Sequence, residues 1–155
     1  MKLTAKEQYG LRALVELAQR YGCGPVALSE IAQVQGLSLG YLEQVAAILR
    51  QAGLLISRRG AAGGYALTRP PGEITVGDVV RVLDGGIRLL PCLEEGSTGG
   101  AACLCAADCT RQAAWGRLQS RLEVALGQVT LADLAAETHF KCVERKDDDG
   151  GKQYP

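Results

Sequence analysis

Four of the six cysteines in this chain lie within eighteen residues of one another. The sequence between them is rich in glycine and alanine and forms helices and strands poorly, so local propensity does not order it. Thiolates are the preferred ligands of soft metals and of iron–sulfur clusters, and either ligand would order such a segment. The pattern therefore predicts a metal or cluster site at four side chains: Cys92, Cys103, Cys105 and Cys109.

Other interpretations of these cysteines stay open. Four thiolates also suit a closed tetrahedral zinc site, and accessible thiols can form a redox switch. Free cysteines are often buried as small hydrophobic residues, although four in so short a segment favour a ligand role. An enzyme is not expected, because the only histidine, His139, is distant and no paired carboxylates accompany the thiols. Cys23 and Cys142 lie apart from the group and are interpreted as incidental thiols.

The length and composition indicate one globular domain with a helical extension. The chain has 155 residues, 47% of them hydrophobic, but only one Trp and one Phe, so aliphatic side chains and alanine must fill the core. No apolar run approaches the roughly 18 residues that a membrane span needs. A polar helix start directly follows Met1, unlike a signal peptide. A cytoplasmic protein is therefore expected, and there clustered cysteines favour metal or redox chemistry over structural disulfides.

The residues before the cysteines have the pattern of a winged helix-turn-helix, in a mainly α protein with a small β-hairpin. Residues 4–7 have capping-box spacing and precede an apolar stripe of helical period. Gly36 suits a left-handed cap, and Ser38 is a good N-cap for the next helix. Strands with a glycine-rich turn follow. The predicted elements are a helix from residue 4, helices over 28–35 and 38–53, and strands over 54–58 and 65–68.

The rest of the chain is predicted to be helical around the cysteine segment. A short helix is expected from Thr75, and a long helix after Cys109 carries apolar residues every three or four positions. The last residues are polar and are expected to be disordered. The predicted units are a winged helix-turn-helix over 1–72, a short helix with a cysteine-rich cofactor loop over 73–109, a long and a short helix over 110–137, and a tail over 138–155.

The helix after Ser38 and the hairpin carry candidate contacts to DNA. In a winged helix-turn-helix, the N-terminal part of the second motif helix meets base edges in the major groove. Glutamine can pair with adenine, glutamate can accept a hydrogen bond from cytosine, and glycine allows close approach. Arginines at the start of the hairpin suit a narrow minor groove. The candidates are Ser38, Gly40, Tyr41, Glu43, Gln44, Arg58 and Arg59.

The distribution of charge agrees with this interpretation. Residues 1–72 have a net charge of +4 and residues 73–155 a net charge of −4, so the half predicted to bind DNA is the basic half. Polar residues on one helix could equally form an ordinary solvated face. The whole series of helices followed by an arginine-bearing hairpin favours DNA.

Several runs of residues occur in a distinctive order and spacing. They are Tyr-Leu-Glu-Gln from Tyr41, Leu-Arg-Gln-Ala-Gly-Leu from Leu49 and Arg-Gly-Ala-Ala-Gly-Gly-Tyr from Arg59, with further matching runs from Ile74 and Val129. Over about residues 1–135 the chain resembles the IscR/NsrR/CymR family of bacterial transcription regulators. The resemblance implies a homodimer built by the long C-terminal helix and a double-stranded, pseudo-palindromic operator. It also implies base and groove contacts at Ser38, Gly40, Tyr41, Glu43, Gln44 and Arg59.

The same resemblance implies ligands for a cofactor. IscR-like and NsrR-like members hold an iron–sulfur cluster with three cysteines, the last two separated by five residues just before the long helix. Cys103 and Cys109 keep this spacing, and Cys92 matches the first cysteine. The resemblance therefore implies these three residues as cluster ligands.

The chain departs from the family at the fourth ligand. The histidine of IscR-like members is replaced by Gln112, and the aspartate of NsrR-like members by Gln8. Cys105 is an additional thiolate and the candidate for this position. Both a 2Fe–2S and a 4Fe–4S cluster stay possible.

The function expected from the two halves is transcription regulation controlled by cluster occupancy. Occupancy would order the 92–109 loop beside the dimer helix and set the spacing of the two recognition helices, which must meet half-sites about one helical turn apart. The alternatives are a zinc-binding or thiol-sensing regulator of the same fold, and a CymR-like regulator acting through a protein partner. CymR-like members lack the cysteine set, which argues against the last alternative.

Overall fold

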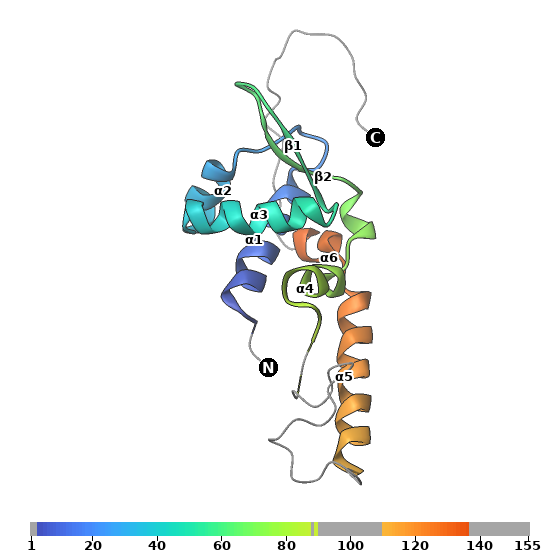
Figure 1. Ribbon diagram of the computed structural model, residues 1–155. Helices are drawn as coiled ribbons and strands as arrows, with labels where there is room; N and C mark the ends of the chain where they lie inside the picture. The colour runs from blue at the N-terminus through green and yellow to red at the C-terminus, as the bar shows by residue number, and fades with distance from the viewer. Residues whose placement is uncertain (1–2, 88, 90–109, 137–155) are drawn as a thin grey trace.

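The computed structural model describes residues 3–87, 89 and 110–136. Its helices form one body from which the β-hairpin projects, and the longest helix extends away from the body on the side opposite the hairpin (Figure 1). This architecture confirms the predicted mainly α winged helix-turn-helix. The elements are α1 (Ala5–Gln19), α2 (Leu28–Gln35), α3 (Leu39–Gln51), β1 (Leu55–Arg58), β2 (Gly64–Leu67), η1 (Pro71–Glu73), α4 (Val76–Asp84), α5 (Thr110–Gln128) and α6 (Leu131–Ala136).

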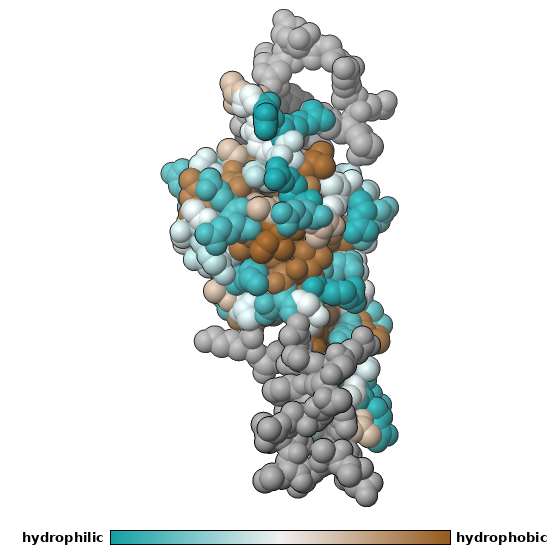
Figure 2. Space-filling model, viewed as in Figure 1, coloured by the Kyte–Doolittle hydropathy of each residue, from teal (hydrophilic) through white to brown (hydrophobic). Residues whose placement is uncertain are grey.

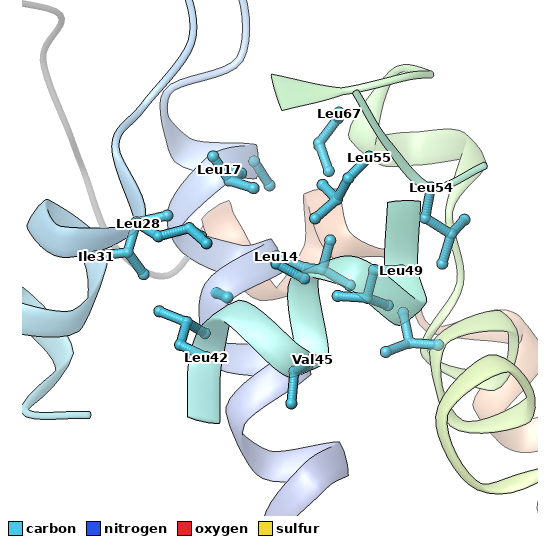
Figure 3. Packing of buried hydrophobic residues seen from close by; sticks show 14 of the residues in the cluster. Leu14, Leu17, Leu28, Ile31, Leu42, Val45, Leu49, Leu54, Leu55 and Leu67 are labelled. Atoms are coloured by element: carbon cyan, nitrogen blue, oxygen red, sulfur yellow. The ribbon is translucent and has the colours of Figure 1, made fainter. Parts of the chain in front are cut away.

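A single aliphatic core joins α1, α2, α3 and the hairpin (Figure 3). The capping box that begins α1 is present, because Thr4 Oγ1 accepts from the Glu7 amide at 3.3 Å and the Glu7 carboxylate accepts from the Thr4 amide at 2.7 Å. Each fully buried aliphatic side chain contributes roughly 1.5–3 kcal/mol, so the apolar stripe of α3 decides which face of that helix points inward. The four predicted inward positions of α3 are all buried: Leu42, Val45, Ala46 and Leu49.

The turn between α2 and α3 is closed by Gly36, as predicted. Gly36 has a φ of +63°, in the left-handed region that favours glycine. The Leu37 amide then donates to the Ala32 carbonyl at 2.8 Å. Ser38 follows in the N-cap position of α3. This tight connection fixes the direction in which α3 leaves the turn.

The hairpin pairs β1 with β2 in antiparallel register, from Leu55 opposite Leu67 to Arg58 opposite Gly64. Val26, from the segment before α2, pairs with Tyr65 on the other side of β2: the two residues exchange backbone hydrogen bonds of 2.9 and 2.8 Å. β2 is therefore held on both edges, and the wing is attached to the helical body by backbone hydrogen bonds as well as by packing.

An ion-pair network at the end of α1 joins it to α2. Arg20 binds Glu16 at 2.7 Å and also pairs with Glu30 of α2. The second oxygen of Glu16 accepts from Gln35 Nε2 at 3.0 Å. Burial acts to lower the pKa of Arg20, but the hydrogen bonds and charges of Glu30 and Glu16 outweigh it and raise that pKa. Because Glu16 and Arg20 are almost fully buried, the network fixes α2 against α1.

A second capping box begins α4. Thr75 Oγ1 accepts from the Asp78 amide at 3.1 Å, and the Asp78 carboxylate accepts from the Thr75 amide at 3.1 Å. Partial burial acts to raise the pKa of Asp78, but the hydrogen bonds from Thr75 and the charge of Arg81 outweigh it, so the pKa lies below its usual value. Gly85 caps the C-terminal end of α4, and its φ of +76° is left-handed.

The C-terminal helices are fixed to α4 by a backbone crossing. The Val76 amide donates to the Val129 carbonyl at 2.8 Å, and the Leu131 amide donates to the Ile74 carbonyl at 2.9 Å. α6 then packs against α1, and Leu131 is fully buried in the core shared by α1, α2 and α3. The end of the predicted C-terminal unit thus contributes to the winged-helix core. Among the described residues, no helix is both long and apolar enough to cross a membrane.

Candidate nucleic-acid interface

The face of α3 opposite the core presents the predicted base-reading residues. Ser38, Gly40, Glu43 and Gln44 are all exposed. A Cβ atom added to Gly40 would meet no heavy atom within 4 Å, so the backbone there is open to a large partner. An exposed glutamine and glutamate at the first turns of a helix can exchange hydrogen bonds with adenine and cytosine edges.

Tyr41 lies differently from the other predicted contacts. It is half-buried, and its ring packs edge-to-face on Tyr9 of α1, with ring centroids 5.0 Å apart and an interplanar angle of 89°. Such aromatic pairs contribute roughly 0.5–1.5 kcal/mol beyond their buried area. Tyr41 therefore anchors the first turn of α3 on α1. The sequence alone did not reveal Tyr9 as its partner, because the two residues are far apart along the chain.

The wing carries Arg58 at the end of β1 and Arg59 in the turn, and both are exposed. The turn is closed by the Gly63 amide, which donates to the Gly60 carbonyl at 2.9 Å. Arg50, in the last turn of α3, donates to Ser57 Oγ of β1 at 3.3 Å and so links the recognition helix to the wing. Sequence reasoning did not single out Arg50, although it lies within the family-like run that begins at Leu49.

The surface of the winged helix is more basic than its net charge indicates. Of the four carboxylates in residues 1–72, Glu7 is buried in the cap of α1, and Glu16 and Glu30 bind Arg20. Only Glu43 remains on the recognition face. Hydrophilic residues also follow the hairpin on the face shown in Figure 2. Exposed arginines in this half are Arg12, Arg50, Arg58, Arg59 and Arg69.

The four predicted ligands Cys92, Cys103, Cys105 and Cys109 lie outside the described residues. The described residues nearest to that segment lie at α5. Thr110 is the first residue of this helix, and the Leu89 amide donates to Oε1 of Gln119 in α5 at 3.5 Å. Within residues 3–87, 89 and 110–136, no group of three or more His, Cys, Asp or Glu side chains is arranged to hold a metal ion. Gln8 is exposed, and its side-chain Nε2 donates to the Leu3 carbonyl at 2.8 Å.

An exposed recognition helix, a basic hairpin and a projecting long helix define a winged-helix DNA-binding regulator. The chain belongs to the Rrf2 family, described as iron-dependent transcriptional regulators, whose sequence pattern matches residues 3–137. It is a DNA-binding transcription regulator, and its relatives are regulators rather than enzymes.

Relatives of two kinds are similar to the chain. The regulator CymR of Bacillus subtilis (strain 168) is 41% identical over 138 residues, which cover 89% of this chain and 92% of the relative. The regulator IscR of Sodalis glossinidius (strain morsitans) is 38% identical over 151 residues, covering 96% and 88%. The solved structure of T. potens IscR superposes with a TM-score of 0.71 at 37% identity, covering 97% of this chain and 94% of that one.

Proposed function

We propose that this regulator binds pseudo-palindromic double-stranded DNA as a homodimer, with α3 in the major groove and the β1–β2 wing at the adjacent minor groove. The exposed polar face of α3 and the arginines of the wing support this assignment. Half-sites of such operators lie about one helical turn apart, so two recognition helices at a fixed separation are required.

The long helix supplies the surface for the second copy. α5 extends away from the body (Figure 1), and it leaves large apolar side chains exposed in successive turns: Trp115 is 41% and Leu118 is 43% exposed. Closer to α4, Leu122 and Leu126 pack on the smaller core formed with Val76 and Val80. Among the described residues, the apolar stripe of α5 is therefore covered near α4 and exposed farther away, and the exposed part suits a symmetric helix pair.

The wing contact can be tested without knowing the operator. We expect Arg59→Ala to weaken binding to a random-sequence duplex roughly tenfold and to reduce the slope of log Kd against log salt by about 0.9, as expected for one lost phosphate contact. Fluorescence anisotropy over a salt series measures both quantities. Arg117→Ala, which removes an exposed arginine from α5, should leave the slope unchanged. Equal slopes for the Arg59→Ala variant and the wild type would contradict the role of Arg59.

We further propose that DNA binding is controlled by an iron–sulfur cluster held by Cys92, Cys103 and Cys109, with Cys105 as the fourth ligand. The chemistry of the donor set fits the group, because four thiolates within eighteen residues match the ligands that such clusters require. When bound, the cluster supplies one-electron redox chemistry and sensitivity to oxidants. The iron dependence in the family's description supports the same assignment.

The observation that best supports control of DNA binding by the cysteine segment is that the residues on both sides of this segment are held at α5. Leu89 contacts the small core that includes Leu122 and Leu126 of α5, while Thr110 begins the helix. α5 packs on α4, and α4 packs on α3. A change in the cysteine segment is therefore transmitted through two helix contacts to the recognition helix.

Anaerobic reconstitution with iron and sulfide tests this proposal. We expect the wild type to gain visible absorbance and acid-labile sulfide, and the Cys92→Ala/Cys103→Ala/Cys109→Ala variant to gain neither. Cys105→Ala separates the fourth ligand from the other three, since it should yield a cluster that is lost faster in air. A wild type without iron, or a triple variant with undiminished absorbance, would overturn the proposal.

Thiol sensing is the second candidate function. The solved structure of B. subtilis CymR is described as that of the global cysteine regulator, and it superposes with a TM-score of 0.70 at 39% identity. A thiol sensor of this fold would contain no iron and would change its DNA affinity with a thiol oxidant. A zinc site would retain stoichiometric zinc without visible absorbance, and a CymR-like mode of action would require a stoichiometric protein partner.

A further inference from the structure

A groove lies between the C-terminal end of α1, the turn after α1 and the β1–β2 hairpin. Its volume is about 200 Å³. Its walls are mostly apolar, and Arg58 of the wing stands among the lining residues. Two of the large side chains are exposed to solvent, Tyr21 by 37% and Ile56 by 42%. The apolar lining consists of Leu17, Tyr21, Pro25, Ile56, Ala66 and Leu67.

We propose that the C-terminal segment 137–155 of this chain occupies the groove, with Phe140 in the apolar pocket and the acidic run Asp147–Asp148–Asp149 against Arg58. This inference rests on the proposed function, because it makes the segment a competitor of DNA for the wing. The segment contains one aromatic residue close to α6 and three consecutive aspartates farther on. An apolar cavity of roughly 150 Å³ holds a benzene ring, so the pocket is large enough for the Phe140 side chain.

The length of the segment allows this placement. α6 ends at Ala136 and packs against α1, whose C-terminal end forms one wall of the groove. Phe140 is four residues beyond Ala136, a reach of about 13 Å, which is more than half of the roughly 22 Å length of α1. Asp147 is eleven residues beyond Ala136, a reach of about 36 Å. One strand of the wing is about 13 Å long. The reach of about 36 Å therefore equals the combined length of α1 and one such strand.

The segment carries both kinds of group that the groove would accept. An apolar wall and Arg58 line the same groove, and the segment has Phe140 and, seven residues farther on, the first of three aspartates. Three carboxylates beside a cationic wing are attractive, and they would repel DNA phosphates approaching the same arginine. Because the segment is part of the chain, its local concentration at the groove is high even when each contact is weak.

Cys23 allows a second test of this placement. It lies between Gly22 and Gly24, which both line the groove, and it is disulfide-bonded, so the prediction of an incidental thiol is wrong for Cys23. Every other cysteine of the chain lies outside the described residues. Cys142 is two residues beyond Phe140, so the proposed placement makes Cys142 the partner of Cys23.

The test compares full-length variants in binding to a fluorescent random-sequence duplex of about 30 base pairs at an ionic strength of about 0.15 M. We expect Asp147→Asn/Asp148→Asn/Asp149→Asn to bind about fivefold more tightly than the wild type and Phe140→Ala about threefold more tightly, because the competitor is weakened. Tyr154→Ala, the matched aromatic control near the end of the chain, should change Kd less than about 1.5-fold. Unchanged Kd values for the triple and Phe140 variants would overturn the proposal.

The same triple substitution in an Arg58→Ala background separates the specific contact from general electrostatics. If the aspartates act at Arg58, the gain in affinity should fall below about 1.5-fold in that background. An equal gain in both backgrounds would overturn the placement. If Arg58→Ala weakens DNA binding while the triple variant changes nothing, only the placement of the segment fails. If Arg58→Ala has no effect on DNA binding, the proposed role of the wing residue fails instead.

Peptide mapping tests the placement directly. Protein purified with a reductant is treated with diamide, which takes up two electrons and two protons as two thiols become a disulfide and so allows the bond of Cys23 to form again. After treatment, mass spectrometry should find a peptide pair joined through Cys23 and Cys142. A bond from Cys23 to a cysteine in 92–109, or no intramolecular bond of Cys23, would contradict the proposal.

Discussion

Gly64→Ala is expected to lose about 3 kcal/mol of folding free energy, together with most of the affinity for DNA. A Cβ atom at Gly64 would overlap the carbonyl carbon and oxygen of Val26 and crowd the Ala27 amide. These atoms are backbone, so no side-chain rotation can relieve the overlap. The chain must move β2 away from Val26 and lose the two hydrogen bonds between Val26 and Tyr65.

The two hydrogen bonds between Val26 and Tyr65 also fix the position of the wing. Without them β2 loses its backbone pairing with the segment before α2, and Arg58 no longer has a fixed place beside the recognition helix. Urea unfolding should show a lower midpoint, and anisotropy should show weaker binding to a DNA duplex.

Gly72→Ala is the matched control for this prediction. A Cβ atom at Gly72 would meet no heavy atom within 4 Å. Its stability should stay within about 0.5 kcal/mol of the wild type. If Gly64→Ala were as stable as Gly72→Ala, the close approach of β2 to Val26 would not be a constraint in solution.

Arg20→Ala is expected to reduce the free energy of unfolding by about 3–5 kcal/mol. The side chain of Arg20 is 10% exposed and that of Glu16 is 5% exposed. Removing the guanidinium leaves the Glu16 carboxylate buried, with Gln35 as its remaining described donor. The desolvation of that charge is then uncompensated, and the connection from α1 to α2 through Glu30 is lost as well. Chemical denaturation followed by far-ultraviolet circular dichroism measures the loss.

Arg81→Ala is the appropriate comparison for Arg20→Ala. Arg81 also pairs with a carboxylate, Asp78 at 3.3 Å, but its side chain is 67% exposed. Water and salt screen such a pair, so its loss should change stability by less than about 1 kcal/mol. A second variant, Glu16→Leu with Arg20→Met, removes both buried charges and should recover part of the stability lost in Arg20→Ala. Equal losses of unfolding free energy in Arg20→Ala and Arg81→Ala would show that burial does not increase the contribution of the ion pair to stability.

The elements could be predicted because their signals are local. Capping at Thr4, the left-handed Gly36 and the inward stripe from Leu42 to Leu49 depend on residues at most seven apart, and the structure confirms each of them. The strands were placed to within one residue. β2 begins at Gly64, one residue earlier than expected, because the ladder continues to Arg58 opposite that glycine.

Contacts between distant residues could not be predicted in the same way. Nothing in the local pattern pairs Tyr41 with Tyr9, or Glu16 with both Arg20 and Gln35. The glycine run after Arg59 indicated only a flexible turn, whereas the fold gives Gly64 a steric role against Val26. The burial of Leu131 was also unexpected, because only the return of α6 across α1 makes a short terminal helix part of the first domain's core.

The sequence by itself determined the class of protein, because helix caps, apolar periodicity and the arginine-bearing hairpin depend on residues that are close together in the chain. It also determined which thiols are available as ligands. The tertiary structure decided how those parts act on one another. It brought both flanks of the cysteine segment to α5, joined Val129, directly after α5, to Val76 of α4, and set the wing beside α3. The physical reason is that caps and stripes depend on interactions within a few residues, whereas coupling depends on which buried faces meet, and that is settled only when the whole core packs.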